Sequence, residues 1–263
     1  MAHDMKPLTR ALTADEIEVI QAPEVKAARE DLAACFQMAA RLNMEEGICN
    51  HFSALVPGRT DLFLVNPYGL SFGEVSASSL LICDFDGNVL AGEGHPEATA
   101  FYIHAQVHKH CPGATACFHT HMPWATSLTL SDEDPLLYAS QSSLKFYGRV
   151  AVDTDYNGLA LGPEEGVRIA RAMGDADVLF MRHHGVMVTA PSIAEAWDDL
   201  YFLERAAQVQ QLAVSSGRKL VPVSAEIARK TAQQIREEDA TSAEMHLASI
   251  KRRLKGDVAP FDA

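Results

Sequence analysis

The chain has 263 residues, of which 48% are hydrophobic, and it carries a formal net charge of −13 at pH 7. This length is sufficient for one large domain that buries most of its apolar surface without disulfides or a structural metal. The acidic balance disfavours binding to nucleic acid or docking on an anionic membrane, since both require a basic face. A small molecule is the partner that we expect.

The cysteines and the hydropathy pattern indicate a cytoplasmic protein. The five cysteines are an odd number and form no CxxC pair, which argues against a disulfide framework and against a cysteine-ligated zinc. No stretch approaches the roughly twenty apolar residues of a membrane span. The N-terminus lacks the apolar core of a targeting segment. We therefore expect a reduced, soluble and untargeted chain.

The first half of the chain predicts a helix followed by short strands. Residues 1–22 are polar and mixed, and 13–16 have the pattern of a capping box, so we expect an arm with a short helix. From Pro23 to about Gly47, apolar residues recur at three- and four-residue steps, which predicts a helix. Short apolar runs between turn residues then predict antiparallel strands. These runs cover 51–56, 62–65 and 80–85.

The second half interleaves strands and helices. Pro163 and the acids after it suit the start of a helix, and Ser192 begins a capping box for a long helix that ends at Gly217. A charged, weakly apolar helical pattern follows, typical of a surface facing solvent or another subunit. The remaining predictions are a helix over 97–110, one or two helical turns over 123–130, and strands over 114–119, 149–152 and 178–181.

This alternation predicts an α/β fold of two or three layers with an at least partly antiparallel sheet. We divide the chain into an N-terminal arm (1–22), one main domain (23–217) and a charged helical C-terminal extension (218–263). The chain contains no GxGxxG, Walker loop or GxSxG elbow, so nucleotide cofactors and serine-hydrolase chemistry lack support.

Three histidines are the candidate metal ligands. His119 and His121 follow an apolar run that predicts a buried strand, and side chains two apart on a strand point to the same face. His184 follows the run 178–181 and precedes Gly185, which permits a tight turn. If the two strands are neighbours, three imidazoles converge. Three ligands with an open position are typical of a catalytic metal site.

The segment 97–108 offers a candidate catalytic acid. Glu97, His104 and His108 are seven and four residues apart and share one helical face. Glu97 is either a ligand or general base, or an acid that the helix dipole favours at a helix N-terminus. For the two histidines we favour a packing or supporting role. Four tyrosines are candidate proton donors between which the sequence does not choose: Tyr138, Tyr147, Tyr156 and Tyr201.

The chain resembles the class II aldolase/adducin family from about residue 31 to residue 211. The residues that carry the resemblance are His104, Cys111-Pro112, His119-Thr120-His121 and His183-His184-Gly185. It implies a single α/β/α domain around a mainly antiparallel central sheet, frequently a homotetramer with active sites at subunit interfaces. It also implies that His119, His121 and His184 hold a divalent metal, most often zinc and in some relatives manganese or iron.

Departures from the family pattern bear on the reaction. Sugar-phosphate aldolases of the family have an acid four positions before the helix histidine, where this chain has Ala100, and Glu97 lies one turn earlier on the same face. The loops 51–53 and 67–69 also differ from the family's phosphate-binding residues, which disfavours a phosphorylated sugar. The same features are similar to a branch that contains decarboxylases of aromatic hydroxy-carboxylates and iron oxygenases of aromatic keto acids.

The leading hypothesis is a divalent-metal-dependent lyase that cleaves a carbon–carbon bond of a hydroxy-carbonyl substrate in an aldolase-type reaction through a metal-stabilised enolate. Glu97 or a tyrosine would move the proton. One alternative is a metal-dependent decarboxylase of an aromatic hydroxy-carboxylate, which shares this intermediate. Two others are a non-catalytic adducin-like interaction domain, which the missing acid at Ala100 favours, and an iron-dependent oxygenase.

Overall fold

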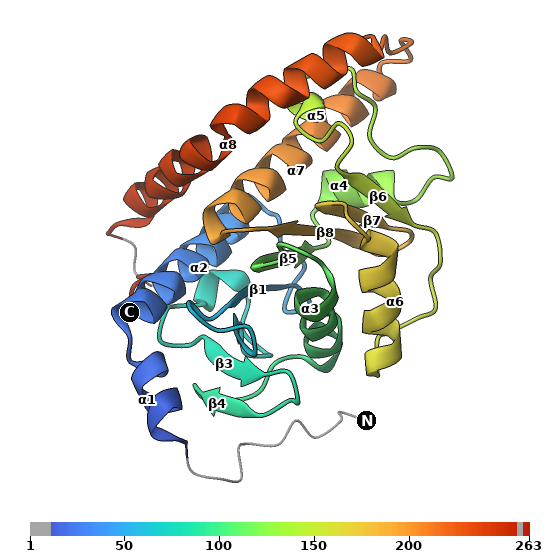
Figure 1. The fold of residues 1–263 in the computed structure, drawn as a ribbon. Coiled ribbons are helices and arrows are strands. Elements are labelled where there is room, and N and C mark those ends of the chain that lie inside the picture. Colours follow the sequence, from blue (N-terminus) through green and yellow to red (C-terminus); the bar gives the residue numbers. More distant parts are fainter. Residues whose placement is uncertain (1–11, 257–259) are drawn as a thin grey trace.

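The computed structural model describes residues 12–256 and 260–263, in which one central sheet of eight strands lies between two layers of helices (Figure 1). The strand order is β4-β3-β2-β1-β5-β8-β7-β6. Of the pairings between neighbouring strands, only that of β6 with β7 is parallel. The α/β/α architecture and the mainly antiparallel sheet are therefore confirmed.

The strands are β1 (His51–Leu55), β2 (Leu62–Val65), β3 (Leu81–Asp84), β4 (Val89–Ala91), β5 (Ala116–Thr120), β6 (Val150–Asp153), β7 (Val178–Met181) and β8 (Gly185–Ala190). The helices are α1 (Ala14–Ile20), α2 (Pro23–Arg41), α3 (Ala98–His110), α4 (Pro123–Leu128), α5 (Gln141–Leu144), α6 (Pro163–Met173), α7 (Ile193–Ser215) and α8 (Ala225–Leu254), with a 3₁₀ turn, η1 (Phe72–Glu74).

Alternation along the strands divides the core between the two faces of the sheet. In β5, Ala116 and Phe118 pack into the large core under α2 and α7, whereas Cys117 belongs to a second core under α3 and α6. Successive side chains of a strand point to opposite faces, so His119 lies on the side of α3 and α6 with Cys117. This parity decides which helices surround the candidate site.

Most predicted elements are present, but the two strands that precede the histidines are not neighbours. The predicted strands 114–119 and 178–181 correspond to β5 and β7, yet β8 lies between them and pairs with both. His184 still reaches the end of β5, because it lies in the tight connection between β7 and β8. The sequence analysis missed β4, β8 and the short helix α5.

The ends of the chain are helical where the structure describes them. The capping box at Thr13 is confirmed, since its side chain accepts from the Glu16 amide and the Glu16 carboxylate accepts from the Thr13 amide. The remainder of the predicted arm, residues 1–11, lies outside the described part. At the other end, α8 runs beside α7 (Figure 1) and places Leu247 and Ile250 in the large core. The division into an arm, a domain and an extension stays a prediction.

Candidate metal centre

Strand β5 positions two of the three histidines. His119 is the fourth residue of β5 and is 1% exposed, and His121 follows the strand directly. The strand is central, because β1 and β8 pair with it on either side. The Nδ1 of His119 lies 2.9 Å from the Val186 carbonyl oxygen on β8. A carbonyl only accepts, so this nitrogen carries the proton and Nε2 presents a lone pair.

The turn between β7 and β8 supplies the third histidine. Only residues 182–184 separate the paired residues Met181 and Gly185, and His183 adopts φ 59°, a left-handed conformation that is uncommon outside glycine. The close approach of Gly185 to β5 leaves no room for a side chain: a Cβ there would lie 2.6 Å from the Thr120 carbonyl oxygen. This close packing holds His184 against the end of β5.

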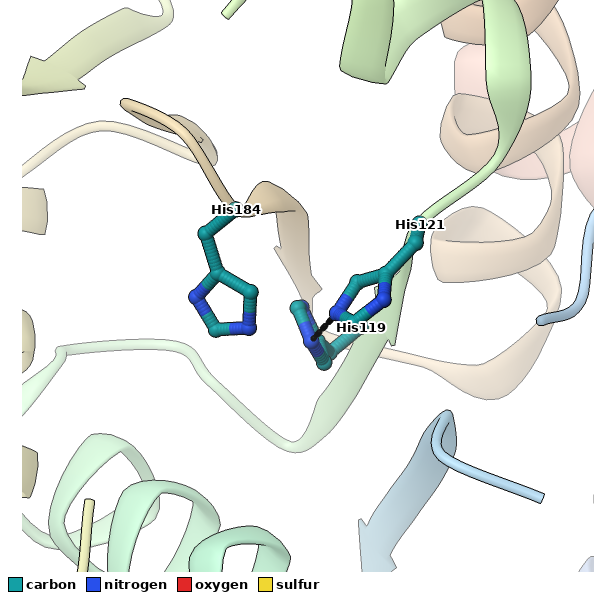
Figure 2. A group of neighbouring side chains, drawn as sticks. All are labelled: His119, His121 and His184. Carbon is teal, nitrogen blue, oxygen red and sulfur yellow. Dashed lines mark hydrogen bonds between the residues drawn. The ribbon is translucent and has the colours of Figure 1, made fainter. Parts of the chain in front are cut away.

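The three imidazoles converge as predicted (Figure 2). One ring nitrogen from each of His119, His121 and His184 lies within 4.8 Å of the others. The ring centroids are 5.0 Å apart for His119 and His121, 4.8 Å for His119 and His184, and 4.9 Å for His121 and His184. Imidazole nitrogens at these separations suit a single divalent ion such as zinc.

The tautomers of the first two histidines favour a cation between them. His121 donates from Nδ1 to the Glu46 carboxylate, so the Nε2 of a neutral His121 ring, like that of His119, presents a lone pair. These two Nε2 atoms lie 3.1 Å apart, joined by the dashed line in Figure 2. Two lone pairs that face each other repel unless a proton or a metal ion lies between them.

The acid–base properties of His119 and His184 suit a metal ion. Burial, followed by the neighbouring His184, lowers the pKa of His119 well below its usual value. Burial and the neighbouring His121 lower the pKa of His184 to about 4. Both groups are therefore neutral near pH 7, which is the form of imidazole that binds metal. The donor set and its protonation state fit a divalent ion.

The sequence analysis missed Glu46, the acid that contacts the centre. Glu46 lies in the loop between α2 and β1, and its backbone amide donates to the Asn50 side-chain oxygen at 2.7 Å. The same oxygen lies 3.4 Å from the amide nitrogen of His121, which links the loop to the histidine. A carboxylate that accepts from a ligating histidine fixes its orientation and raises its basicity. The only indication in the sequence was an acid pair before Gly47.

Glu97 lies at the N-terminus of α3. Its Oε2 accepts from the Ala100 amide at 2.9 Å and from the Thr99 hydroxyl, so the carboxylate caps the helix. Thr99 lines the cavity beside the histidines, whereas Glu97 is not among its lining residues. The capping position matches the second of the two interpretations of this residue. Its catalytic role stays a prediction.

A buried chain of hydrogen bonds lies behind the metal centre. The His108 Nδ1 is 2.6 Å from the Ala114 carbonyl, so it donates, and burial lowers the pKa of His108 to about 4. The neutral ring then accepts at Nε2 from the Ser53 hydroxyl at 2.7 Å. Ser53 accepts in turn from His104 Nδ1 at 2.5 Å, and His104 Nε2 accepts from His51 Nδ1 at 2.8 Å. Because the Ala114 carbonyl can only accept, it fixes the direction of every hydrogen bond in this series from His108 to His51.

Replacement of Ser53 by alanine is expected to destabilise the protein by about 1–3 kcal/mol, because it leaves buried groups of His104 and His108 without a partner. Ser53 is 0% exposed. Urea unfolding measures the change, with Ser242→Ala on the exposed face of α8 as the matched control. A Ser53→Ala variant as stable as the control would contradict the inferred chain.

A cavity of about 380 Å³ opens beside His121 and His184. The segment after β6, helix α6 and the turn between β7 and β8 form its walls. Of the four candidate tyrosines, only Tyr156 lines it, and the ring of Tyr156 lies 6.3 Å from that of His183. The rings of Tyr138 and Tyr147 pack against each other, 4.9 Å apart. Tyr156 is therefore the tyrosine placed to meet a small ligand at the metal centre.

Across residues 12–256 and 260–263, no helix combines the length and apolar character needed to cross a membrane.

The family model for the class II aldolase and adducin N-terminal domain matches residues 30–211. A putative aldolase class 2 protein of Caulobacter vibrioides is 37% identical over 203 residues, which are 77% of this chain and 78% of that protein.

Solved structures agree with these sequence relatives. The crystal structure of an aldolase II superfamily protein from Pseudomonas syringae matches with a TM-score of 0.86 and 30% identity, over 94% of this chain and 99% of the other. L-fuculose 1-phosphate aldolase from Glaciozyma antarctica matches with a TM-score of 0.78 and 25% identity, over 94% of each chain. The chain therefore belongs to the class II aldolase and adducin family.

Proposed function

We propose that this chain is a divalent-metal-dependent lyase that cleaves a carbon–carbon bond of a small hydroxy-carbonyl substrate in an aldolase-type reaction. The observation that carries the proposal is the convergence of one ring nitrogen from each of His119, His121 and His184 within 4.8 Å. Three convergent imidazoles are the donor set of a catalytic metal site. The fit to an aldolase family supports the reaction class.

His119, His121 and His184 would hold the ion, and zinc is the metal that we propose, with manganese and iron as alternatives. A bound divalent metal supplies Lewis-acid stabilisation of the negative charge that develops on a substrate oxygen, worth several kcal/mol. Decarboxylation requires the same stabilisation, so a decarboxylase is the alternative that the site serves equally well. An interaction domain would not require the ion.

The chain's own residues orient the ligands and move the proton. The Val186 carbonyl fixes His119, and Glu46 fixes His121, each through Nδ1. Two carboxylates are candidates to accept or return the substrate proton: Glu97, predicted from the sequence, and Glu46. The position of Glu46 against His121 and in the cavity wall favours Glu46. Tyr156 in the same wall is the candidate donor of the proton that the enolate carbon takes up after the carbon–carbon bond breaks.

Elemental analysis of the purified protein tests the metal centre. We expect close to one equivalent of zinc, manganese or iron per chain, lost in the His184→Ala variant because only two ligands then remain. His110→Ala, on the exposed end of α3, is the matched control and keeps its metal. Equal metal content in the native and His184→Ala proteins, or none in either after incubation with each ion, would contradict the proposal.

The family and the free thiols support a proposal for the assembly and location of the protein. We propose a homotetramer, as is frequent in the family, and a cytoplasmic location. The five cysteines are all free, and four of them are buried.

A further inference from the structure

Two arginines line the cavity beside the metal centre, and the first is fully occupied. Arg168 donates from Nη1 and Nη2 to the two carboxylate oxygens of Asp153, at 2.6 and 2.7 Å. It also donates from Nε and Nη2 to Glu165, at 2.9 and 2.7 Å. These hydrogen bonds raise the pKa of Arg168, with the pair to Asp153 contributing most. Arg168 therefore joins α6 to β6, and most of its donors are already used.

The second arginine, Arg182, has no such partner. No ion pair or side-chain hydrogen bond joins it to any other residue in the described part of the chain. Its backbone is nevertheless fixed, since its amide donates to the Asp153 carbonyl at 2.9 Å, and the next amide, that of His183, donates to the Thr129 carbonyl at 3.3 Å. Arg182, with the five N–H donors of its guanidinium unpaired in the described part of the chain, thus lines the cavity two residues before His184.

The charges of the cavity select the kind of anion that Arg182 accepts. Four carboxylates line it, those of Glu46, Asp153, Asp155 and Glu165, and Arg168 is paired with two of them. Apart from the proposed metal ion, Arg182 is the free cation among the described residues of the lining for a phosphate dianion that faces this negative charge, whereas a carboxylate carries a single charge. The planar guanidinium also matches a carboxylate in bidentate geometry. A monoanionic ligand is the better complement.

The rest of the cavity wall suits an organic acid. Ile103, Ile169 and Met181 line it together with the exposed side chain of Leu159. A cavity that combines a candidate metal centre, a free arginine and these apolar side chains accommodates a carbon skeleton with polar groups at its two ends. This combination distinguishes the cavity from one built for an inorganic ion.

We propose that Arg182 binds a substrate carboxylate that is separate from the oxygens facing the three histidines, so that the substrate is a small hydroxy acid or keto acid instead of a phosphate ester. This inference rests on the proposed metal-dependent lyase function. Arg182 is then a specificity-determining residue: it selects the anionic end of the substrate and directs the opposite end to the metal.

Calorimetric titration of the zinc-loaded protein with three hydroxamates tests the assignment. Acetohydroxamate only chelates the metal, succinate monohydroxamate adds a carboxylate, and the corresponding succinamide replaces that carboxylate by a neutral group of the same shape. We expect the carboxylate compound to bind about tenfold more tightly than the amide, as for a charge-assisted bidentate contact. In Arg182→Gln, the ratio of the affinity for the carboxylate compound to the affinity for the amide falls to about one, while the affinity for acetohydroxamate is unchanged.

Arg171→Gln, at the exposed end of α6, is the matched control and keeps the tenfold ratio. A ratio in Arg182→Gln equal to that of the native protein would overturn the assignment. Tighter binding of phosphonoacetohydroxamate than of succinate monohydroxamate would overturn the choice of a carboxylate. Absence of acetohydroxamate binding to the native protein would instead refute the metal-dependent function, and the inference would fall with it.

Discussion

Replacement of Gly185 by alanine is expected to weaken zinc binding by at least about tenfold, because the new Cβ displaces the ligands themselves. It would lie 2.6 Å from the Thr120 carbonyl oxygen and 2.8 Å from Cδ2 of His121. The first atom belongs to the backbone of the central strand β5, so the turn must move instead. Since His184 precedes Gly185 directly, the movement separates His184 from the other two histidines.

Competition with a chromophoric chelator measures the zinc affinity of the Gly185→Ala variant. Gly73→Ala is the matched control, since a Cβ there meets only Ala40 Cβ, at an ordinary 3.7 Å. Thermal unfolding of both variants separates a local effect on the metal centre from a general loss of stability. A zinc affinity within twofold of the native protein would show that the approach of Gly185 to β5 does not hold the third ligand in place.

The three candidate metal ligands could be predicted from the sequence because their geometry is largely local. His119 and His121 share a face through strand periodicity alone, and His184 lies in a short connection that Gly185 makes possible. The pairing of strands was harder to predict. Only three residues separate β7 from β8, so the two apolar runs lack the usual turn residues between them, and β8 was missed. Without β8, convergence of the histidines was conditional on β5 and β7 being neighbours, whereas β8 lies between them.

The C-terminus of α2 also depends on contacts that are not local in the sequence. Helix α2 was expected to end near Gly47 but ends at Arg41, and Asn43 adopts a left-handed φ of 55° just beyond it. Asparagine is enriched in this conformation, yet its presence alone does not require a helix to stop. The earlier end frees the residues up to Asn50 to form the loop that carries Glu46. Local propensity placed the helix, but tertiary packing set its boundary.

The acid near the centre could not be predicted, because its partner is distant in sequence. Glu46 and His121 are 75 residues apart, and nothing in the spacing of either residue indicates the contact. Helical periodicity instead indicated Glu97 as the candidate acid, because Glu97 shares a helical face with His104. In the structure one carboxylate oxygen of Glu97, Oε2, accepts two hydrogen bonds at the N-terminus of α3. A carboxylate in the first turn has this local role available regardless of the fold around it.

Replacement of Glu46 by glutamine is expected to lower zinc affinity or turnover by about tenfold or more, the lower part of the range for groups that orient metal-bound histidines. Glutamine keeps the shape but removes the negative charge that raises the basicity of His121. The Glu46 side chain is 67% exposed, so solvent screens part of the effect. Zinc affinity and the rate of cleavage of any accepted hydroxy-carbonyl substrate provide the two measurements.

The Glu97→Gln variant distinguishes the role of Glu97 from that of Glu46. If Glu97 only caps α3, this variant lowers the unfolding free energy by up to about 1 kcal/mol and leaves zinc affinity unchanged. A large loss of turnover in Glu97→Gln with normal metal content would instead assign the proton transfer to Glu97, as predicted from the sequence, and leave Glu46 an orienting role. Because capping and proton transfer require different properties of one carboxylate, stability and turnover report on them independently.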